Sequence, residues 1–202
     1  MIITIDGPAG TGKSTVSKAV AQKLGFTYFN TGALYRALAY ETDRTKKDPV
    51  EVARDFPFRI EGDRYFIRDQ DVTEVIRSPE VTRLSSLYSA IPAVREGILH
   101  FQKTFALQGN TVFEGRDLGT VVFPSAEVKI FLTATPEKRA ERRFKESKGV
   151  TFEEVLEDLK ERDFADTHRK VAPLKQAVDA HLIDTTNLTV NEVVDQIIMF
   201  VK

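Results

Sequence analysis

The first fourteen residues constrain the fold more than any other stretch of this chain. Residues 2–5 are all β-branched, which is typical of a short strand buried on both faces. The next eight, Gly7-Pro8-Ala9-Gly10-Thr11-Gly12-Lys13-Ser14, fit the pattern G-x-x-x-x-G-K-[ST] without a mismatch. Backbone N–H groups in such a loop cradle phosphate oxygens, and the helix that follows presents its positive N-terminus to the same anion. Because the motif lies between a predicted strand and a predicted helix, it predicts a nucleotide-phosphate loop.

Two side chains of this loop have predicted roles. Lys13 is expected to reach the β- and γ-phosphates, and Ser14 is expected to offer its hydroxyl to Mg²⁺. The residues expected to contact the nucleotide are Gly7, Pro8, Ala9, Gly10, Thr11, Gly12, Lys13, Ser14 and Thr15.

Composition narrows the class of protein and its compartment. The 202 residues allow one domain with a small insertion, and 42% hydrophobic with 29% charged residues are ordinary for a globular protein. A net charge of −1 does not favour binding to nucleic acid or to an anionic membrane. There is no cysteine, no apolar run of membrane-spanning length, and the N-terminus reads as a strand rather than a signal peptide. We therefore expect a cytoplasmic protein without nucleic-acid or membrane partners.

Predicted strands and helices alternate along the chain, which is typical of a parallel α/β sheet. The predicted core strands are residues 2–5, 26–29, 111–113, 128–132 and 181–184. The predicted helices are residues 13–24 and 33–40, three that begin at Pro49, Pro79 and Pro92, a basic one from Pro136 to about Lys148, one from 152 to about 168, and one after Thr189. Residues 56–60 and 64–67 flank Gly62-Asp63 and predict a small hairpin between helices.

In open α/β sheets, ligands bind at the carboxyl ends of the strands. The polar residues predicted to lie there are Asp6, Asn30-Thr31, residues 114–117 and Asp184. Glu114 ends a hydrophobic strand, where phosphate-loop proteins carry an acid that acts on Mg²⁺. An ordinary charged strand end explains Glu114 equally well, so both interpretations stay open.

Arginines form a second signal in the last third of the chain. They share one helix face at Arg139, Arg142 and Arg143, and another at Arg162 and Arg169, where Asp163 and Asp166 are neighbours. A solvated face, or ion pairing with these aspartates, is the simpler explanation for each group. Several arginines around one phosphate loop nevertheless suit phosphoryl transfer, in which charge on the moving group must be neutralised.

The sequence carries no sign of a catalytic base. His100, His168 and His181 are scattered without pairing or metal-ligand spacing, and we interpret all three as structural. A phosphate acceptor would need no base, because a phosphate dianion is already a nucleophile. Two alternatives stay open: a kinase for another nucleotide or a hydroxylated metabolite, and a non-catalytic nucleotide-dependent switch protein.

Four stretches give the chain a clear resemblance to one family. They are TIDGPAGTGKS, FNTGALYRALA, FEGRDLGTVVFPSAEVKIFLTA and KERDFADTHRKVAPL. Together they resemble the bacterial-type cytidylate (CMP) kinases, which belong to the nucleoside monophosphate kinases. The resemblance implies a P-loop kinase with three layers: a five-stranded parallel sheet flanked by helices, with a lid and an acceptor-binding arm. It also implies a monomer that uses ATP and Mg²⁺ to phosphorylate CMP and dCMP.

The resemblance also implies roles for individual residues. The acceptor phosphate would be held by Thr31, Arg36, Arg116 and Arg169, the ribose by Asp166, and the cytosine by Ser86, Arg95 and Asp117. Catalytic charge would come from Lys13, Arg116 and the lid residues Arg139, Arg142, Arg143 and Arg162, and Mg²⁺ would be bound through Ser14 and Glu114.

The resemblance divides the chain into three parts. The core would be residues 1–42, 109–135 and 170–202, the acceptor arm 43–108, and the lid with its following helix 136–169. The segment from 43 to about 71 is shorter than the insert usual in the family and holds little more than the predicted hairpin, so the resemblance implies a shortened acceptor arm.

Overall fold

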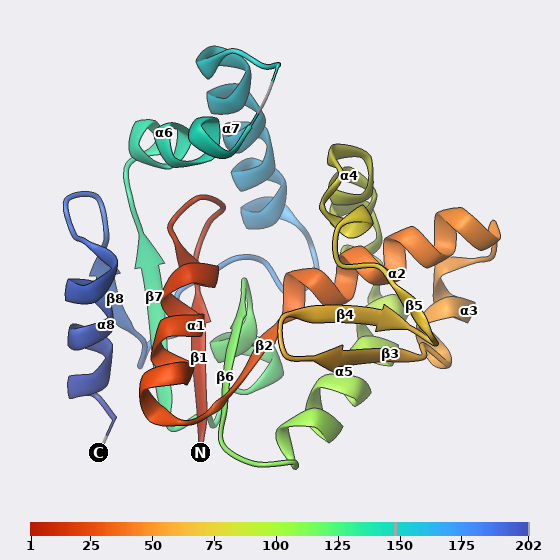
Figure 1. The fold of residues 1–202 in the computed structure, drawn as a ribbon, viewed down its shortest axis with the longest axis horizontal. Helices are drawn as coiled ribbons and strands as arrows, with labels where there is room; N and C mark the ends of the chain where they lie inside the picture. Colours follow the sequence, from red (N-terminus) through yellow and green to blue (C-terminus); the bar gives the residue numbers. More distant parts are fainter. Residues whose placement is uncertain (148, 202) are drawn as a thin grey trace. The chain divides into compact units, whose positions relative to one another are not determined.

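The computed structural model describes residues 1–147 and 149–201, shown as a ribbon in Figure 1. Contacts divide the chain into two compact units, one of Met1–Phe29 with Gln108–Lys202 and one of Asn30–Leu107. Of the acceptor arm expected at 43–108, all but residue 108 belongs to the second unit.

A parallel sheet forms the centre of the first unit. Its five strands follow the order β2-β6-β1-β7-β8, and every pairing described around β1 and β7 is parallel. The strands are β1 Ile2–Asp6, β2 Thr27–Asn30, β6 Thr111–Gly115, β7 Val128–Thr133 and β8 His181–Asp184. The predicted sheet is therefore confirmed, and its strands end at one edge, where polar residues follow.

Two helices cover one face of this sheet. They are α1 (Lys13–Leu24) and α8 (Val190–Met199), which contact each other in front of the strands in Figure 1. Val16 and Val20 of α1 and Ile197 of α8 are buried in one apolar cluster with Ile5 and Ile130 of the sheet. Burial of these side chains fixes α1, and with it the phosphate loop, against the ends of β1 and β6.

Two further helices of this unit follow β7. Helix α6 is Pro136–Glu146, and α7 is Phe152–His168. Their N-caps confirm the local signals: the Thr135 hydroxyl accepts from the Lys138 N–H, and Thr151 forms a capping box with Glu154. Helix α6 ends at Glu146. The predicted end near Lys148 lies outside the described residues.

The second unit contains four helices and a small sheet. The helices are α2 Thr31–Thr45, α3 Pro49–Arg54, α4 Pro79–Tyr88 and α5 Pro92–Ala106, with a 3₁₀ turn η1 at Val75–Arg77. Strands β3 Phe58–Glu61 and β4 Arg64–Ile67 form the predicted hairpin, and β5 Gln70–Asp71 adds a third antiparallel strand. The sequence did not indicate β5, because two polar residues carry no periodicity.

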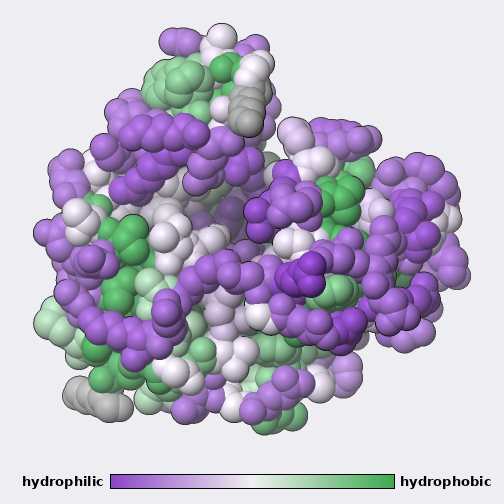
Figure 2. Space-filling view, viewed as in Figure 1, coloured by the Kyte–Doolittle hydropathy of each residue, from purple (hydrophilic) through white to green (hydrophobic). Residues whose placement is uncertain are grey.

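Within the part of the chain that the structure describes, none of the helices combines the length and apolar character needed to cross a membrane. Hydrophilic residues cover most of the visible face in Figure 2, including the band formed by α6.

Candidate active site at the phosphate loop

The phosphate loop connects β1 to α1 and has the backbone shape that its glycines predict. Gly10 and Gly12 have φ values of 78° and 89°, which side chains rarely allow. A Cβ on Gly12 would meet nothing within 4 Å, so the loop leaves open space at the start of α1. No side chain of the described residues caps this helix. Its first N–H groups are therefore available to a phosphate group.

Lys13 is buried in this loop although it carries a charge. Its Nζ donates to the Pro8 carbonyl at 2.6 Å, and only 7% of the residue is exposed. Burial, followed by the nearby Arg116 guanidinium, lowers the pKa of Lys13 well below its ordinary value. An added anion would favour the charged form, so the site is suited to binding phosphate.

Glu114 shows how the loop and the sheet fit a magnesium ion. Its Oε1 accepts hydrogen bonds from the Ser14 hydroxyl at 2.8 Å and from the Tyr28 hydroxyl at 2.7 Å. Among the described residues, its buried Oε2 has no hydrogen-bond partner. Buried carboxylate oxygens are almost always paired, and Mg²⁺ is held by few carboxylates together with water and substrate phosphates. Ser14 and Glu114 therefore fit the ion in chemistry and placement.

Asp6 ends β1 just before the loop and fixes a turn that sequence reasoning did not foresee. Its two carboxylate oxygens accept from the backbone N–H groups of Leu118 at 3.0 Å and Gly119 at 2.8 Å. These residues start a short π-helical turn, η2 (Leu118–Val122), directly after Asp117. Burial raises the pKa of Asp6 to about 6, although both hydrogen bonds oppose the rise.

Four charged residues form a connected network beyond β6. Arg116 Nε donates to Asp166 at 2.9 Å, and Arg169 Nη2 donates to Asp117 at 3.0 Å. Arg169 also lies 4.0 Å from Asp166, which connects the two pairs. Burial raises the pKa of Asp166, but the guanidinium groups of Arg116, Arg162 and Arg169 outweigh it and lower that pKa overall. The end of α7 is thus held to the end of β6 by charge.

This network and the phosphate loop form one electrostatic cluster. The groups that shift the pKa of Lys13 are Arg116, Glu114, Arg162 and Asp166. The structure therefore brings together, within the first unit, the loop lysine, two of the predicted catalytic arginines and the predicted metal carboxylate. An excess of guanidinium and ammonium charge at a loop shaped for phosphate suits the stabilisation of a transferring phosphoryl group.

The arginines of α6 contact the phosphate loop itself. Arg139 is buried and donates to the Ala9 carbonyl at 3.0 Å, and it forms an ion pair with Asp163 of α7 at 2.5 Å. Arg142 Nη1 donates to the Thr11 carbonyl at 3.4 Å, and Arg142 Nη2 donates to the Thr185 carbonyl at 2.6 Å. In this structure both side chains hold the loop in place through its carbonyl groups.

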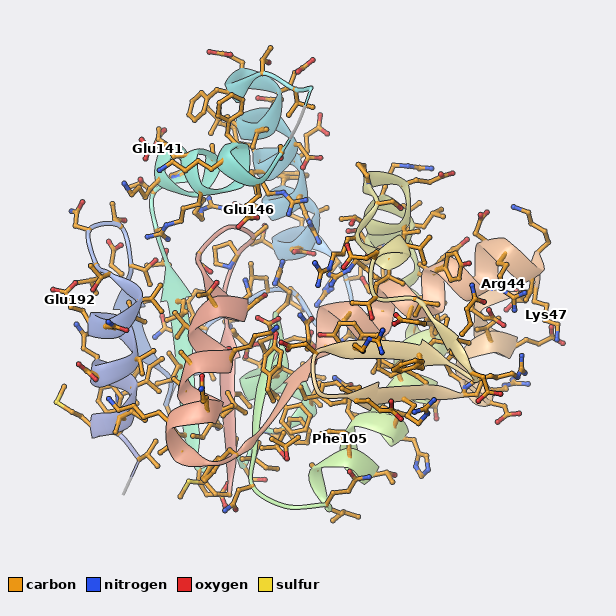
Figure 3. The ribbon with its side chains drawn as sticks, in the orientation of Figure 1. Arg44, Lys47, Phe105, Glu141, Glu146 and Glu192 are labelled. Carbon is orange, nitrogen blue, oxygen red and sulfur yellow. The ribbon has the colours of Figure 1, made fainter. Side chains whose placement is uncertain are left out.

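The outer side of α6 is different. Arg143 is exposed. Glu141, labelled in Figure 3, pairs with Lys138 at 3.2 Å on the exposed side of the helix. A lid role for Arg139, Arg142, Arg143 and Arg162 stays a prediction, and the contacts of Arg139 and Arg142 limit how much of α6 could move.

The remaining predicted substrate residues lie in the second unit. Thr31 starts α2 and accepts from Gln102 Nε2 at 3.2 Å. Arg95 is buried on α5, donates to the Ser89 carbonyl at 3.2 Å, and has its guanidinium carbon 5.7 Å from the centre of the Tyr35 ring. Arg36 lies on α2 and Ser86 on α4. Their joint use with Arg116 and Asp117 stays a prediction.

Three residues with clear contacts to the site were not singled out by the sequence for a role in it. They are Tyr28, which bonds Glu114, Asp163, which bonds Arg139, and Thr185, which bonds Arg142 and the loop. Asp163 was noted only as an ion-pairing neighbour on its own helix. A tyrosine in a predicted strand carries no signal for its partner, because the order of strands in a sheet does not follow from the sequence of one strand.

Comparisons with known proteins agree with this geometry. The profile of the cytidylate kinase family matches residues 3–202. The chain belongs to the cytidylate kinase family. A cytidylate kinase from Ligilactobacillus salivarius is 46% identical over 99% of this chain and 96% of its own length. Another, from Caldanaerobacter subterraneus, is 47% identical over 96% of this chain and 92% of its own.

A solved structure supports the fold independently. The alignment with the shikimate kinase of Bacteroides thetaiotaomicron covers 100% of this chain and 98% of that kinase. The TM-score is 0.50 and the sequence identity is 16%. At that identity the likeness concerns the fold alone. The match to the cytidylate kinase family confirms the resemblance predicted from the four stretches of sequence.

Proposed function

We propose that this chain transfers the γ-phosphoryl group of ATP to CMP, giving ADP and CDP, and that it accepts dCMP as well. The observation that carries the proposal is the cluster of Lys13, Arg116, Arg162 and Asp166 at the open phosphate loop of a cytidylate kinase family member. A site rich in guanidinium groups suits a phosphate acceptor better than a hydroxyl acceptor, because a phosphate dianion is already a nucleophile.

In this mechanism, the chain supplies position and charge. The N–H groups at the start of α1 and the ammonium group of Lys13 bind the donor phosphates, while Arg116 and Arg162 neutralise charge on the group in transfer. The CMP phosphate is the nucleophile and needs no proton acceptor. Ser14 and Glu114 would hold Mg²⁺, which would neutralise charge on the donor phosphates.

The acceptor is recognised in this proposal by its phosphate, ribose and base. Thr31, Arg36, Arg116 and Arg169 bind the phosphate. Asp166 binds the ribose, and Ser86, Arg95 and Asp117 bind the cytosine. The ion pair between Asp117 and Arg169 supports a shared location for the base and phosphate contacts. We further propose a cytoplasmic monomer without nucleic-acid or membrane partners.

An assay of ADP release tests the proposal. CMP, dCMP, UMP, AMP, GMP and a hydroxylated metabolite are offered with ATP, and then with GTP, in the presence of Mg²⁺. We expect CMP and dCMP to have the highest kcat/KM. Preference for another monophosphate or for the hydroxyl acceptor would overturn the substrate, and nucleotide binding without turnover of any acceptor would favour a switch protein.

A further inference from the structure

The Tyr28 hydroxyl makes a contact that the proposed mechanism does not yet use. It donates to Glu114 Oε1 at 2.7 Å, from the strand β2 that lies next to β6 in the sheet. The same oxygen accepts from Ser14 at 2.8 Å, so two hydroxyl groups converge on one carboxylate atom. The other atom, Oε2, is buried and has no hydrogen-bond partner among residues 1–147 and 149–201.

This asymmetry divides the carboxylate into a held oxygen and an available one. A glutamate has three rotatable bonds, and a free carboxylate at a strand end would rotate among several orientations. Glu114 is only 4% exposed, so water does not compete strongly for its oxygens. Two donors on Oε1 therefore select the rotation in which Oε2 is left for a cation.

Of these two donors, only Tyr28 is independent of the metal. The Ser14 hydroxyl is itself a predicted ligand of Mg²⁺, and its orientation would change when its oxygen coordinates the ion. Tyr28 is not a predicted ligand of the ion. Its ring lies on β2, with Lys18 Nζ 5.6 Å from the ring centre. Partners outside the first coordination shell commonly fix the ligands of a metal in this way.

We propose that Tyr28 is a positioning residue for the metal site, holding Glu114 so that Oε2 faces the Mg²⁺ that accompanies the nucleotide. The inference rests on the proposed role of Glu114 in metal binding. It assigns Tyr28 no contact with substrate and no part in proton transfer. Its consequence is that the hydroxyl of Tyr28 contributes to metal affinity and not to the affinity for CMP.

The test is Tyr28→Phe, which removes the hydroxyl and keeps the ring and its contact with Lys18. Mn²⁺ is the probe, titrated into the full chain saturated with a non-hydrolysable ATP analogue and followed by electron paramagnetic resonance. We expect the dissociation constant for Mn²⁺ to rise roughly tenfold. The Mg²⁺ concentration for half-maximal rate should rise similarly, while the KM for CMP at saturating Mg²⁺ stays within about twofold.

Tyr40→Phe is the matched control. Tyr40 accepts a hydrogen bond from Gln70 in the second unit, so this variant also loses one hydroxyl with a partner. It should bind Mn²⁺ as the unmodified chain does. Thermal melting curves show whether each variant is folded. Tyr28→Leu, which also lacks the hydroxyl, is the second variant and should weaken Mn²⁺ binding at least as much as Tyr28→Phe.

A double-mutant cycle with Glu114→Gln separates the two levels of the proposal. If Glu114→Gln weakens Mn²⁺ binding and Tyr28→Phe has no further effect in that background, Tyr28 acts through Glu114. Unchanged Mn²⁺ affinity in Tyr28→Phe, or an equal effect in both backgrounds, would overturn the positioning role alone. Unchanged affinity in Glu114→Gln would instead overturn the metal role of Glu114.

Discussion

Charged side chains of this site are held in place by contacts with other groups of the protein. Lys13 is buried with its ammonium group on a backbone carbonyl, and Asp117 is paired with Arg169. Both side chains are therefore held in place before any substrate binds. A site that is ordered in advance loses little conformational entropy when the ligand arrives.

Replacement of Lys13 by alanine should stop phosphoryl transfer without unfolding the chain. The ammonium group lies where the β- and γ-phosphates are expected, and loss of one such charge costs about 10²–10³ in kcat. Steady-state rates and a thermal melting curve measure the two effects. The control is Lys23→Ala, whose ion pair with Asp195 lies on the surface. Normal turnover in folded Lys13→Ala would remove this loop from the mechanism.

Asp117 and Arg116 should separate base selection from phosphate binding. An ionised carboxylate accepts hydrogen bonds only, so Asp117 suits the amino group of cytosine and disfavours the carbonyl of uracil. Binding of UMP would leave a buried polar group unpaired. The kcat/KM for UMP should therefore be about tenfold to a few hundredfold lower than for CMP. Asp117→Asn, whose amide also donates, should lower kcat/KM for CMP and narrow the CMP/UMP ratio.

Arg116→Ala is the companion variant and should weaken CMP and UMP by similar factors. Both variants remove one ion pair of the same network, with Arg169 or with Asp166, so damage to the network alone would affect them alike. The kcat/KM values for CMP and UMP decide the matter. An unchanged ratio in Asp117→Asn together with a shifted ratio in Arg116→Ala would reverse the two assignments.

At the scale of elements, the site depends on how the turn after β6 is held. The end of β1 supplies Asp6, whose two bonds to the N–H groups of η2 hold the segment that follows Arg116 and Asp117. A π-helical turn is rare in proteins and frequent at functional sites. Here a buried carboxylate stabilises the turn, and both elements belong to the first unit.

Asp6 should make stability depend on pH in a defined direction. Its pKa in the folded chain is about 6, against an ordinary value of 3.8, so the folded state holds this proton more tightly than the unfolded state. Asp6 therefore makes its full contribution to the free energy of unfolding at low pH. That contribution is lost as the pH rises to about 6, and the total loss is about 3 kcal/mol. The charges that face it, Asp117 and Lys13, modulate this loss.

Asp6→Asn removes that proton linkage. Denaturant unfolding measures the free energy of unfolding of both chains between about pH 4 and pH 7. Relative to the unmodified chain, the variant should become more stable by about 3 kcal/mol as the pH rises. A constant offset is also expected, because the amide cannot accept both N–H bonds as well as a carboxylate does. The control is Asp195→Asn on the surface. Parallel curves for Asp6→Asn and the unmodified chain would contradict the raised pKa.

Helix α6 should respond to nucleotide only beyond Arg142. Arg139 and Arg142 attach its first part to the phosphate loop and to Thr185, whereas Arg143 is exposed. Hydrogen exchange with and without a CMP–ATP bisubstrate analogue measures this. We expect residues 136–142 to be protected in both states and residues 143–147 to gain protection on binding. A large gain across 136–142 would contradict the anchoring role of the two arginines.

The whole molecule should function as a single copy. The network that joins Arg116, Asp117, Asp166 and Arg169 is complete within one chain, and so is the hydroxyl pair on Glu114. Light scattering after gel filtration should therefore give a mass near 22.8 kDa with and without nucleotide. A dimer whose dissociation lowers kcat would show that the site needs a second chain.

The parts of this protein that the sequence alone predicted are those encoded by neighbouring residues. The phosphate loop needs its glycines, its lysine and its serine at fixed spacing, and helix caps such as Thr151 with Glu154 join residues three apart. Alternation of strands and helices predicted the parallel sheet for the same reason. The family, too, followed from contiguous stretches of sequence.

Only the tertiary structure decided what these residues meet across the sheet. The order β2-β6-β1 places Tyr28 and Ser14 on the same oxygen of Glu114, which favours a metal site over an ordinary charged strand end. The sequence left Arg139 between a solvated face and a site face, and the structure buries it against the loop carbonyl of Ala9. Such contacts join residues about a hundred positions apart, and they depend on strand order and helix packing, which local patterns do not encode.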